Sequence, residues 1–298
     1  MCAAVRSQRP CGRERHREPR RMAERLLLLG GRLADLDRAI LRLMHEHRVF
    51  TTGQLAQAFF DSHDRAEHRL RQLTDAKVLA CFRPHTRHGE GSAGAAVLAA
   101  EQASTVRRLG YRTDKALELA HSQRLAQTVG INGFFTALLG HAHRQRPARA
   151  RLTAWLSERA CHDLWGHVVR ADGYGRWQEA DREVDSFLEY DRGTEPIERP
   201  PAKLAGYQEL AAATQIPTHG LFWPPSARRE ASIRQALADE GRWGRVRFLV
   251  ATASPTLRFG PAEAAWLLLG QTWPRRRLIK LDDIDVDAWT PISAGPTR

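Results

Sequence analysis

In the stretch EVDSFLEYDRGTEP, residues 183–196, the first nine residues place carboxylates and one aromatic at odd positions and mostly apolar side chains at even positions. Side chains along a strand point to opposite faces in turn, so this pattern predicts a strand with one largely apolar face. The other face would carry four carboxylates around one aromatic ring: Glu183, Asp185, Glu189 and Asp191, around Phe187. Carboxylates that share a face repel one another unless a cation neutralises them. The stretch therefore predicts either a cation site or a network of ion pairs.

An aspartate earlier in the chain extends this pattern. Residues 167–177, HVVRADGYGRW, predict a strand that ends at Asp172, followed by a turn that contains Gly173 and Gly175. If this strand and the acidic one form a hairpin with a long turn, Asp172 lies near Glu189. Two carboxylates from adjacent strands are a sufficient anchor for Mg²⁺ or Mn²⁺. With a lysine beside them, they form the arrangement that metal-dependent phosphodiester hydrolysis requires.

The sequence around the hairpin predicts a mixed sheet flanked by helices, which is typical of an α/β domain. Strands are expected over residues 151–158, 219–225 and 245–254, and helices over residues 200–212, 226–241 and 261–270. The chain contains no GxGxxG, GxxxxGK[ST] or GxSxG motif. A dinucleotide-binding fold, a P-loop and a serine hydrolase therefore have no support.

The first third of the chain follows a helical pattern. Apolar residues recur at helical spacing over residues 33–50. Thr51 or Thr52 can cap a short second helix, and Asp64 can cap a third helix that runs to about Lys77. Three helices with a short turn between the second and third predict a helix-turn-helix.

Two strand-like segments, residues 78–84 and 95–100, would add a wing to this unit, and further helices are expected over 101–110 and 123–144. The third helix carries side chains that can reach base edges and phosphates in the major groove: Arg65, His68, Arg69, Arg71 and Gln72. We therefore expect double-stranded DNA as a partner. The alternative is a protein-interaction module, because helix-turn-helix units also serve that purpose.

The composition is strongly basic. The 298 residues carry a net charge of +12, and 42 of the 46 basic residues are arginine. This balance favours a polyanionic partner, DNA or RNA, while the alternative is the codon bias of a GC-rich genome. Four scattered cysteines without a CxxC pair do not predict a zinc site or a disulfide framework. No apolar run is long enough to cross a membrane, so we expect a cytoplasmic protein.

Three segments resemble actinobacterial replication-relaxation proteins: RADGYGRW (170–177), FLEYDRGTEP (187–196) and AKLAGY (202–207). The likeness covers roughly residues 33–255 and is most specific in the acidic block, with Lys203 and Tyr207 after it. It implies a mixed α/β fold in which an N-terminal winged helix-turn-helix precedes a domain similar to PD-(D/E)xK nucleases. The implied organisation is a disordered basic arm (1–31), the winged helix-turn-helix (32–115) and the nuclease-like domain with a basic C-terminal segment (116–298).

The resemblance also implies roles for individual residues. Asp172 stands where the nuclease motif has its first Asp, and Glu189 where it has its Asp or Glu, so these two would hold Mg²⁺ or Mn²⁺. The position of the motif lysine is occupied by Asp191, and Lys203 on the following helix is the plausible substitute. Ala171 replaces the proline that usually precedes the first Asp. The expected catalytic set is Asp172, Glu189, Lys203 and Asp191.

The implied function is that of a DNA-binding accessory protein in the replication, relaxation or transfer of a plasmid or integrative element, with metal-dependent nicking of DNA. Two alternatives stay open. In the first, Glu189 and Asp191 pair with Arg192 or Lys203 in a structural ion network, and the nuclease-like domain is inactive. In the second, the protein is a non-catalytic transcriptional regulator, or a scaffold for a relaxase or replication initiator.

Overall fold

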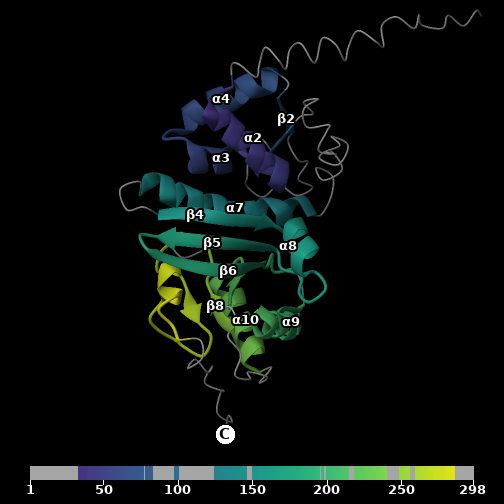
Figure 1. Ribbon diagram of the computed structural model, residues 1–298, viewed down its shortest axis with the longest axis vertical. Coiled ribbons are helices and arrows are strands. Elements are labelled where there is room, and N and C mark those ends of the chain that lie inside the picture. The colour runs from purple at the N-terminus through teal and green to yellow at the C-terminus, as the bar shows by residue number, and fades with distance from the viewer. Residues whose placement is uncertain are drawn as a thin grey trace, which may run out of the picture.

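The computed structural model describes most of the chain outside the first 32 residues. The described ranges are 33–76, 78–82, 97–100, 124–145, 150–194, 196–197, 199–214, 218–239, 248–255 and 259–285. The expected basic arm over residues 1–31 and the expected helix over 101–110 lie outside them. Figure 1 shows the N-terminal helices above a long helix and a sheet, with further helices beyond the sheet. No described helix is long and apolar enough to cross a membrane.

The N-terminal unit consists of three helices and a small antiparallel sheet. The helices are α2 (Asp35–His47), α3 (Thr52–Phe59) and α4 (His63–Asp75). Strands β1 (Val49–Thr51), β2 (Leu79–Phe82) and β3 (Val97–Ala100) pair in the order β1-β3-β2. The three helices and both segments of the expected wing are therefore present.

Of the two helix caps predicted in this unit, the structure confirms the one of α3 and corrects the one of α4. Thr51 caps α3 as expected, because its hydroxyl accepts a hydrogen bond from the backbone N–H of Gln54 at 3.1 Å. The prediction of Asp64 as the cap of α4 is wrong. Ser62 is the cap, since it has the extended backbone of a capping residue and its hydroxyl accepts from the N–H of Arg65 at 3.3 Å. Asp64 lies inside the first turn.

The second unit is a six-stranded mixed sheet in the order β4-β5-β6-β7-β8-β9. Its strands are β4 (Ala150–Ser157), β5 (Gly173–Glu179), β6 (Arg182–Tyr190), β7 (Thr218–Trp223), β8 (Phe248–Thr252) and β9 (Leu267–Leu268). The pairs β6–β7 and β7–β8 are parallel, and the other pairs are antiparallel. The mixed α/β fold predicted from the sequence is confirmed.

Helices cover both faces of this sheet. On one face, α7 (Arg124–Arg144) buries Phe134, Phe135 and Leu138 against strand residues such as Val184 and Leu188. The short 3-10 helix η2 (Leu278–Leu281) completes this core, so the C-terminal segment up to residue 285 belongs to the domain. The other face packs on α8 (Glu158–Trp165), α9 (Arg199–Thr214) and α10 (Ala227–Asp239).

The strand predicted over residues 167–172 is absent. Residues 166–168 form a turn, and β5 begins after Asp172 rather than ending there. Gly173 and Gly175, which the sequence placed in a turn, lie in the strand. A Cβ on either glycine would come within 3.0 Å of the Phe135 ring, so the glycines allow α7 to lie close on the sheet. The hairpin instead turns tightly at Ala180, whose φ is 55°.

The helix predicted over residues 261–270 is also wrong, because the segment contains turns and β9. Its residues Trp266, Leu267, Leu268 and Leu269 are all buried. Consecutive buried side chains suit an extended segment that is enclosed on both faces. The arginines that follow are engaged within the domain: Arg275 pairs with the buried Glu230, and Arg277 pairs with Glu179 at 2.9 Å.

The two units share a packed junction. Trp155 on β4 contacts the cores of both units, and its ring stacks on His47 at 3.7 Å and on Phe135 at 4.8 Å between centroids. Asn132 on α7 donates from its side-chain amide to the carbonyls of His47 (3.1 Å) and Val49 (2.7 Å). The N-terminal unit is therefore attached to the sheet by buried contacts as well as by the chain.

Candidate functional site

Asp172 and Glu189 lie next to each other at the open end of the β5–β6 hairpin. The antiparallel register pairs Gly173 with Leu188, and the N–H of Asp172 donates to the carbonyl of Leu188 at 3.2 Å. This register brings Asp172 opposite Glu189, at the edge where β6 ends. Their predicted proximity is confirmed, although it depends on a strand that follows Asp172 and on a tight turn.

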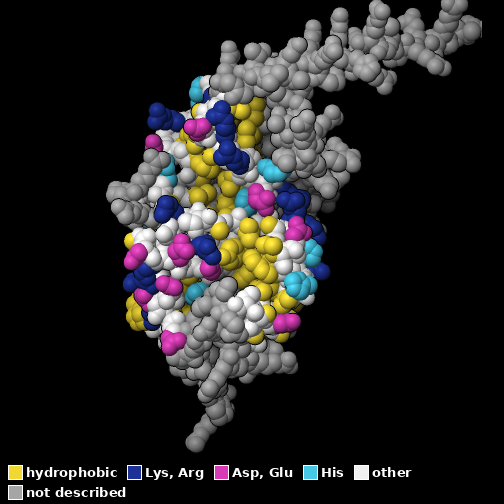
Figure 2. Space-filling model, in the orientation of Figure 1, with side chains coloured by type: hydrophobic (Ala, Val, Ile, Leu, Met, Phe, Trp, Pro, Cys, Tyr) yellow, Lys and Arg dark blue, Asp and Glu magenta, His cyan; other side chains and the backbone are white. Residues whose placement is uncertain are grey.

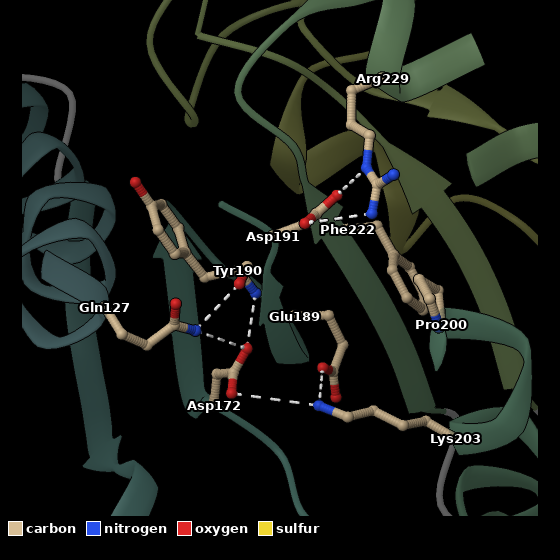
Figure 3. Close-up of a pocket in the computed structure, with 9 residues that line it drawn as sticks. All are labelled: Gln127, Asp172, Glu189, Tyr190, Asp191, Pro200, Lys203, Phe222 and Arg229. Atoms are coloured by element: carbon tan, nitrogen blue, oxygen red, sulfur yellow. Dashed lines mark hydrogen bonds and ion pairs between the residues drawn. The ribbon is translucent and has the colours of Figure 1, made fainter. Parts of the chain in front are cut away.

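Asp172 is held by groups from three elements. Its Oδ2 accepts hydrogen bonds from the backbone N–H of Tyr190 at 2.8 Å and from the amide of Gln127 on α7 at 3.4 Å. The same Gln127 amide donates to the carbonyl of Tyr190 at 2.9 Å. Oδ1 lies 4.0 Å from the ammonium of Lys203. Figure 3 shows Gln127 and Lys203 approaching Asp172 from opposite sides.

Glu189 is buried, and α9 supplies partners to both of its oxygens. The Lys203 ammonium donates to Oε2, and the Tyr207 hydroxyl donates to Oε1. Residues four apart on a helix lie on the same face, so Lys203 and Tyr207 reach the same carboxylate from consecutive turns. The expectation that Lys203 replaces the missing motif lysine is consistent with this position, since its ammonium reaches both acids.

A glycine allows α9 to approach this closely. A Cβ on Gly206 would lie 2.5 Å from the carbonyl oxygen of Val168 and 3.1 Å from the Cβ of Val169. These residues belong to the loop that leads into Asp172. Tyr207, the next residue, has no exposed surface. The AKLAGY segment thus provides both the cation of the site and the close packing that positions it.

The site disfavours a second negative charge. Burial, and after it the charge of Glu189, raise the pKa of Asp172 from 3.8 to about 7, although Lys203 acts in the opposite direction. Burial also raises the pKa of Tyr207 well above 10, with the charge of Glu189 acting in the same direction. Tyr207 therefore stays protonated as a hydrogen-bond donor, and a bound cation would favour the ionised form of Asp172.

The donor set fits a divalent ion that prefers oxygen. Asp172 and Glu189 offer carboxylates, and Tyr190 offers a main-chain carbonyl next to them; these are the ligand types that Mg²⁺ and Mn²⁺ take. Within the described ranges, no group of three or more His, Cys, Asp or Glu side chains forms a metal-binding cluster. Any further ligands would come from water or from a phosphate of the substrate.

Asp191 lies in the same pocket but faces away from the two acids. Its carboxylate pairs with Arg229 on α10 at 2.5 Å, and Oδ1 accepts from the N–H of Gly193 at 2.7 Å. Figure 3 shows this pair on the far side of the pocket from Lys203. Neither Arg229 nor Gln127 was predicted from the sequence. Each lies on a helix far from the acidic block in the chain, so no local motif marks it.

The remaining acids of β6 do not join this site. Asp185 pairs with Arg176 at 2.8 Å and accepts a hydrogen bond from the Tyr174 hydroxyl, and Glu183 lies 3.9 Å from Arg176. Glu183, Asp185 and Glu189 share one face of β6 as predicted, whereas Asp191 follows the end of the strand. The side chains alternate as predicted, but the acids divide into separate ion-paired groups along the strand.

The residues predicted to contact DNA all lie on α4, and most of them have partners within the protein. Arg69 binds the buried carboxylate of Asp37, and its Nη1 donates to Gln72 at 2.9 Å. Arg71 pairs with Glu67 at 2.9 Å, and His68 lies 3.0 Å from Gln72. Arg65 is exposed at the start of the helix. Of the five, Arg69 has a clear structural role.

A family model described as replication-relaxation matches residues 41–223, which is more than half of the chain. The match includes the second half of α2, the helices α3, α4, α7 and α9, and the β5–β6 hairpin. It therefore contains Asp172, Glu189, Lys203 and Tyr207, and ends before Arg229. No curated protein and no solved structure matches the chain.

Proposed function

Because the chain belongs to the replication-relaxation family, whose name points to a role in replication or relaxation, we propose that it binds double-stranded DNA and nicks it in a metal-dependent reaction. The biological setting would be the replication, relaxation or transfer of a plasmid or integrative element. A relaxase or a replication initiator is the protein partner that suits this role. The N-terminal helix-turn-helix unit would contribute duplex affinity, with the exposed Arg65 of α4 available to phosphates.

The observation that carries the catalytic part is the convergence of Asp172, Glu189 and Lys203 in one pocket. A bound Mg²⁺ or Mn²⁺ would supply an activated water and would stabilise the charge that develops on the phosphate. Asp172 and Glu189 would hold the ion. The ammonium of Lys203 would add positive charge beside the scissile phosphate. Tyr207 and Gln127 would keep Glu189 and Asp172 in position through their hydrogen bonds.

The first test is a nicking assay on supercoiled plasmid with Mg²⁺, with Mn²⁺ and with EDTA. We expect nicked product in the presence of metal, and a loss of about 100-fold or more in Glu189→Gln and Asp172→Asn. Glu183→Gln is the matched control, because it makes the same chemical change on the same strand at an exposed position. Nicking that persists in EDTA, or that survives Glu189→Gln, would contradict the assignment.

One observation favours a second candidate, a DNA-binding protein without catalysis. Asp191 occupies the position of the motif lysine, and Arg229 engages it in an ion pair. In this case Asp172, Glu189 and Lys203 form a structural ion network. The assay separates the two candidates, because a protein of this kind would shift a labelled duplex in every lane without cutting it.

A further inference from the structure

A groove lined by arginines lies beside the acidic pocket. It has an empty volume of about 1210 Å³ and is bounded by the end of α2, the first turns of α7, the start of α8 and the loop before β5. Among the described residues, the arginines that line it are Arg48, Arg124, Arg159 and Arg170. Asp172 lines both this groove and the acidic pocket, so the groove leads directly to the candidate site.

Three of these arginines are available to a ligand. Arg159 lies 3.5 Å from Glu46, which also accepts a hydrogen bond from Ser157. By contrast, no carboxylate of the described residues lies within ion-pair distance of Arg48, Arg124 or Arg170, and Arg124 and Arg170 are exposed. This differs from α4, where Arg69 and Arg71 each have an acidic partner. Among the described residues, the groove therefore holds three arginines without an acidic partner, whereas α4 holds one, Arg65.

The elements that carry these arginines are firmly positioned. Arg48 follows α2 with a positive φ of 71°. The two hydrogen bonds from Asn132 to the carbonyls of His47 and Val49 hold this connection against α7. Arg124 begins α7 itself, and Arg170 lies two residues before Asp172. Figure 2 shows basic and histidine side chains gathered beside the position of α8, below the N-terminal helices.

This arrangement suits a chain of phosphates. Guanidinium groups bind phosphate oxygens in a bidentate manner, and several fixed arginines along one groove match a repeating anion better than a single small one. A polyanion that follows the groove reaches Asp172 at its end. We propose that Arg48, Arg124 and Arg170 bind the sugar-phosphate backbone of DNA and lead it to the acidic site. This rests on the proposed function, since it names the path by which the substrate of that site enters.

The test measures binding by the full-length protein in EDTA, so that cleavage does not contribute. Fluorescence anisotropy with a labelled duplex would be recorded over a series of salt concentrations for wild type, Arg124→Glu/Arg170→Glu and the milder Arg124→Gln/Arg170→Gln. For Gln/Gln, which removes two phosphate contacts, we expect about tenfold weaker binding and a decrease of about 2 in the slope of log K against log salt. We expect a larger loss of affinity for Glu/Glu. Arg228→Glu on the exposed face of α10 is the control for a change of charge alone.

The results separate this proposal from the proposed function. If Gln/Gln folds as the wild type does and binds with unchanged affinity and salt slope, the groove is not the DNA path, whatever the nicking assay shows. If the groove variants lose affinity while no variant or wild type nicks DNA, the groove assignment stands and the catalytic proposal fails. Tighter binding of an RNA duplex of the same sequence would overturn the assignment of DNA as the ligand.

Discussion

At the residue scale, Asp172 connects the acidic pocket with the arginine groove. It is the only described residue that lines both the acidic pocket and the arginine groove. Its carboxylate contacts the side-chain amide of Gln127 on α7 and the ammonium of Lys203 on α9. The raised pKa of Asp172 follows from this position, because burial and Glu189 both oppose its ionisation. Such perturbed groups are common in functional sites, where a ligand later compensates the charge.

The raised pKa of Asp172 makes stability depend on pH. The pKa is about 7 in the folded protein and about 4 in the unfolded chain, so the folded state binds the proton more tightly. The contribution of this residue to the free energy of unfolding is therefore lost as pH rises towards 7. On going from pH 5.5 to pH 8 in the absence of metal, we expect the ionisation of Asp172 to lower the free energy of unfolding by about 2 kcal/mol.

This dependence is measured by urea denaturation of wild type and Asp172→Asn at the two pH values. Relative to wild type, Asp172→Asn should gain stability on going from pH 5.5 to pH 8. Asp181→Asn, in the exposed β5–β6 turn, is the control and should follow the wild type. A constant difference between wild type and Asp172→Asn at both pH values would show that Asp172 titrates normally.

At the scale of elements, α4 and α9 each use a basic side chain to bind a buried carboxylate of another element. In α9, Lys203 and Tyr207 point from consecutive turns towards one buried carboxylate. In α4, Arg69 reaches across to Asp37 in α2, and Asp37 also accepts from the N–H of Ala34 at 2.8 Å. The helix predicted to read DNA thus uses one of its arginines to join two helices of its own unit.

Arg69→Ala should destabilise the protein by about 2 kcal/mol, because it leaves the buried carboxylate of Asp37 without its cation. Arg71→Ala should change the free energy of unfolding by less than about 0.5 kcal/mol, since its pair with Glu67 is exposed. Chemical denaturation at neutral pH measures both. Equal effects of the two substitutions would mean that the Arg69–Asp37 pair adds nothing to stability.

At the scale of the whole molecule, the junction between the N-terminal unit and the sheet is built around His47 and Trp155. The two rings stack, and Trp155 also contacts Phe50 and Phe135. Burial lowers the pKa of His47 from 6.5 to about 3, so the ring is neutral at physiological pH. The same junction forms one wall of the arginine groove. The position of the groove relative to the acidic pocket therefore depends on this contact.

Because His47 is buried in its neutral form, the protein should become less stable in mild acid. The unfolded chain binds the proton near pH 6.5 and the folded protein only near pH 3, so stability is lost as pH falls below 6.5. Between pH 8 and pH 5.5 we expect a loss of about 1.5 kcal/mol from this residue. His47→Phe, which keeps a ring against Trp155, should remove that loss in denaturation experiments. If His47→Phe and wild type lose stability in parallel, His47 already carries its proton in the folded state.

The sequence alone predicted those features that depend on neighbouring residues. The alternation in β6, the capping of α3 by Thr51 and the boundaries of α7, α9 and α10 all follow from local spacing. It also predicted the neighbourhood of Asp172 and Glu189, although through the wrong strand. It misread Gly173 and Gly175 as a turn because the reason for these glycines is the ring of Phe135, which lies nearly 40 residues earlier.

The tertiary structure alone decided which charges are paired. Asp191 and Arg229, Asp37 and Arg69, and Arg275 and Glu230 meet because elements far apart in the chain pack against each other. The same packing leaves Arg48, Arg124 and Arg170 together in one groove. Periodicity reports which side of an element is buried, but not which element buries it. The ion pairs and the groove are therefore properties of the packing, whereas the helices and strands are largely properties of the sequence.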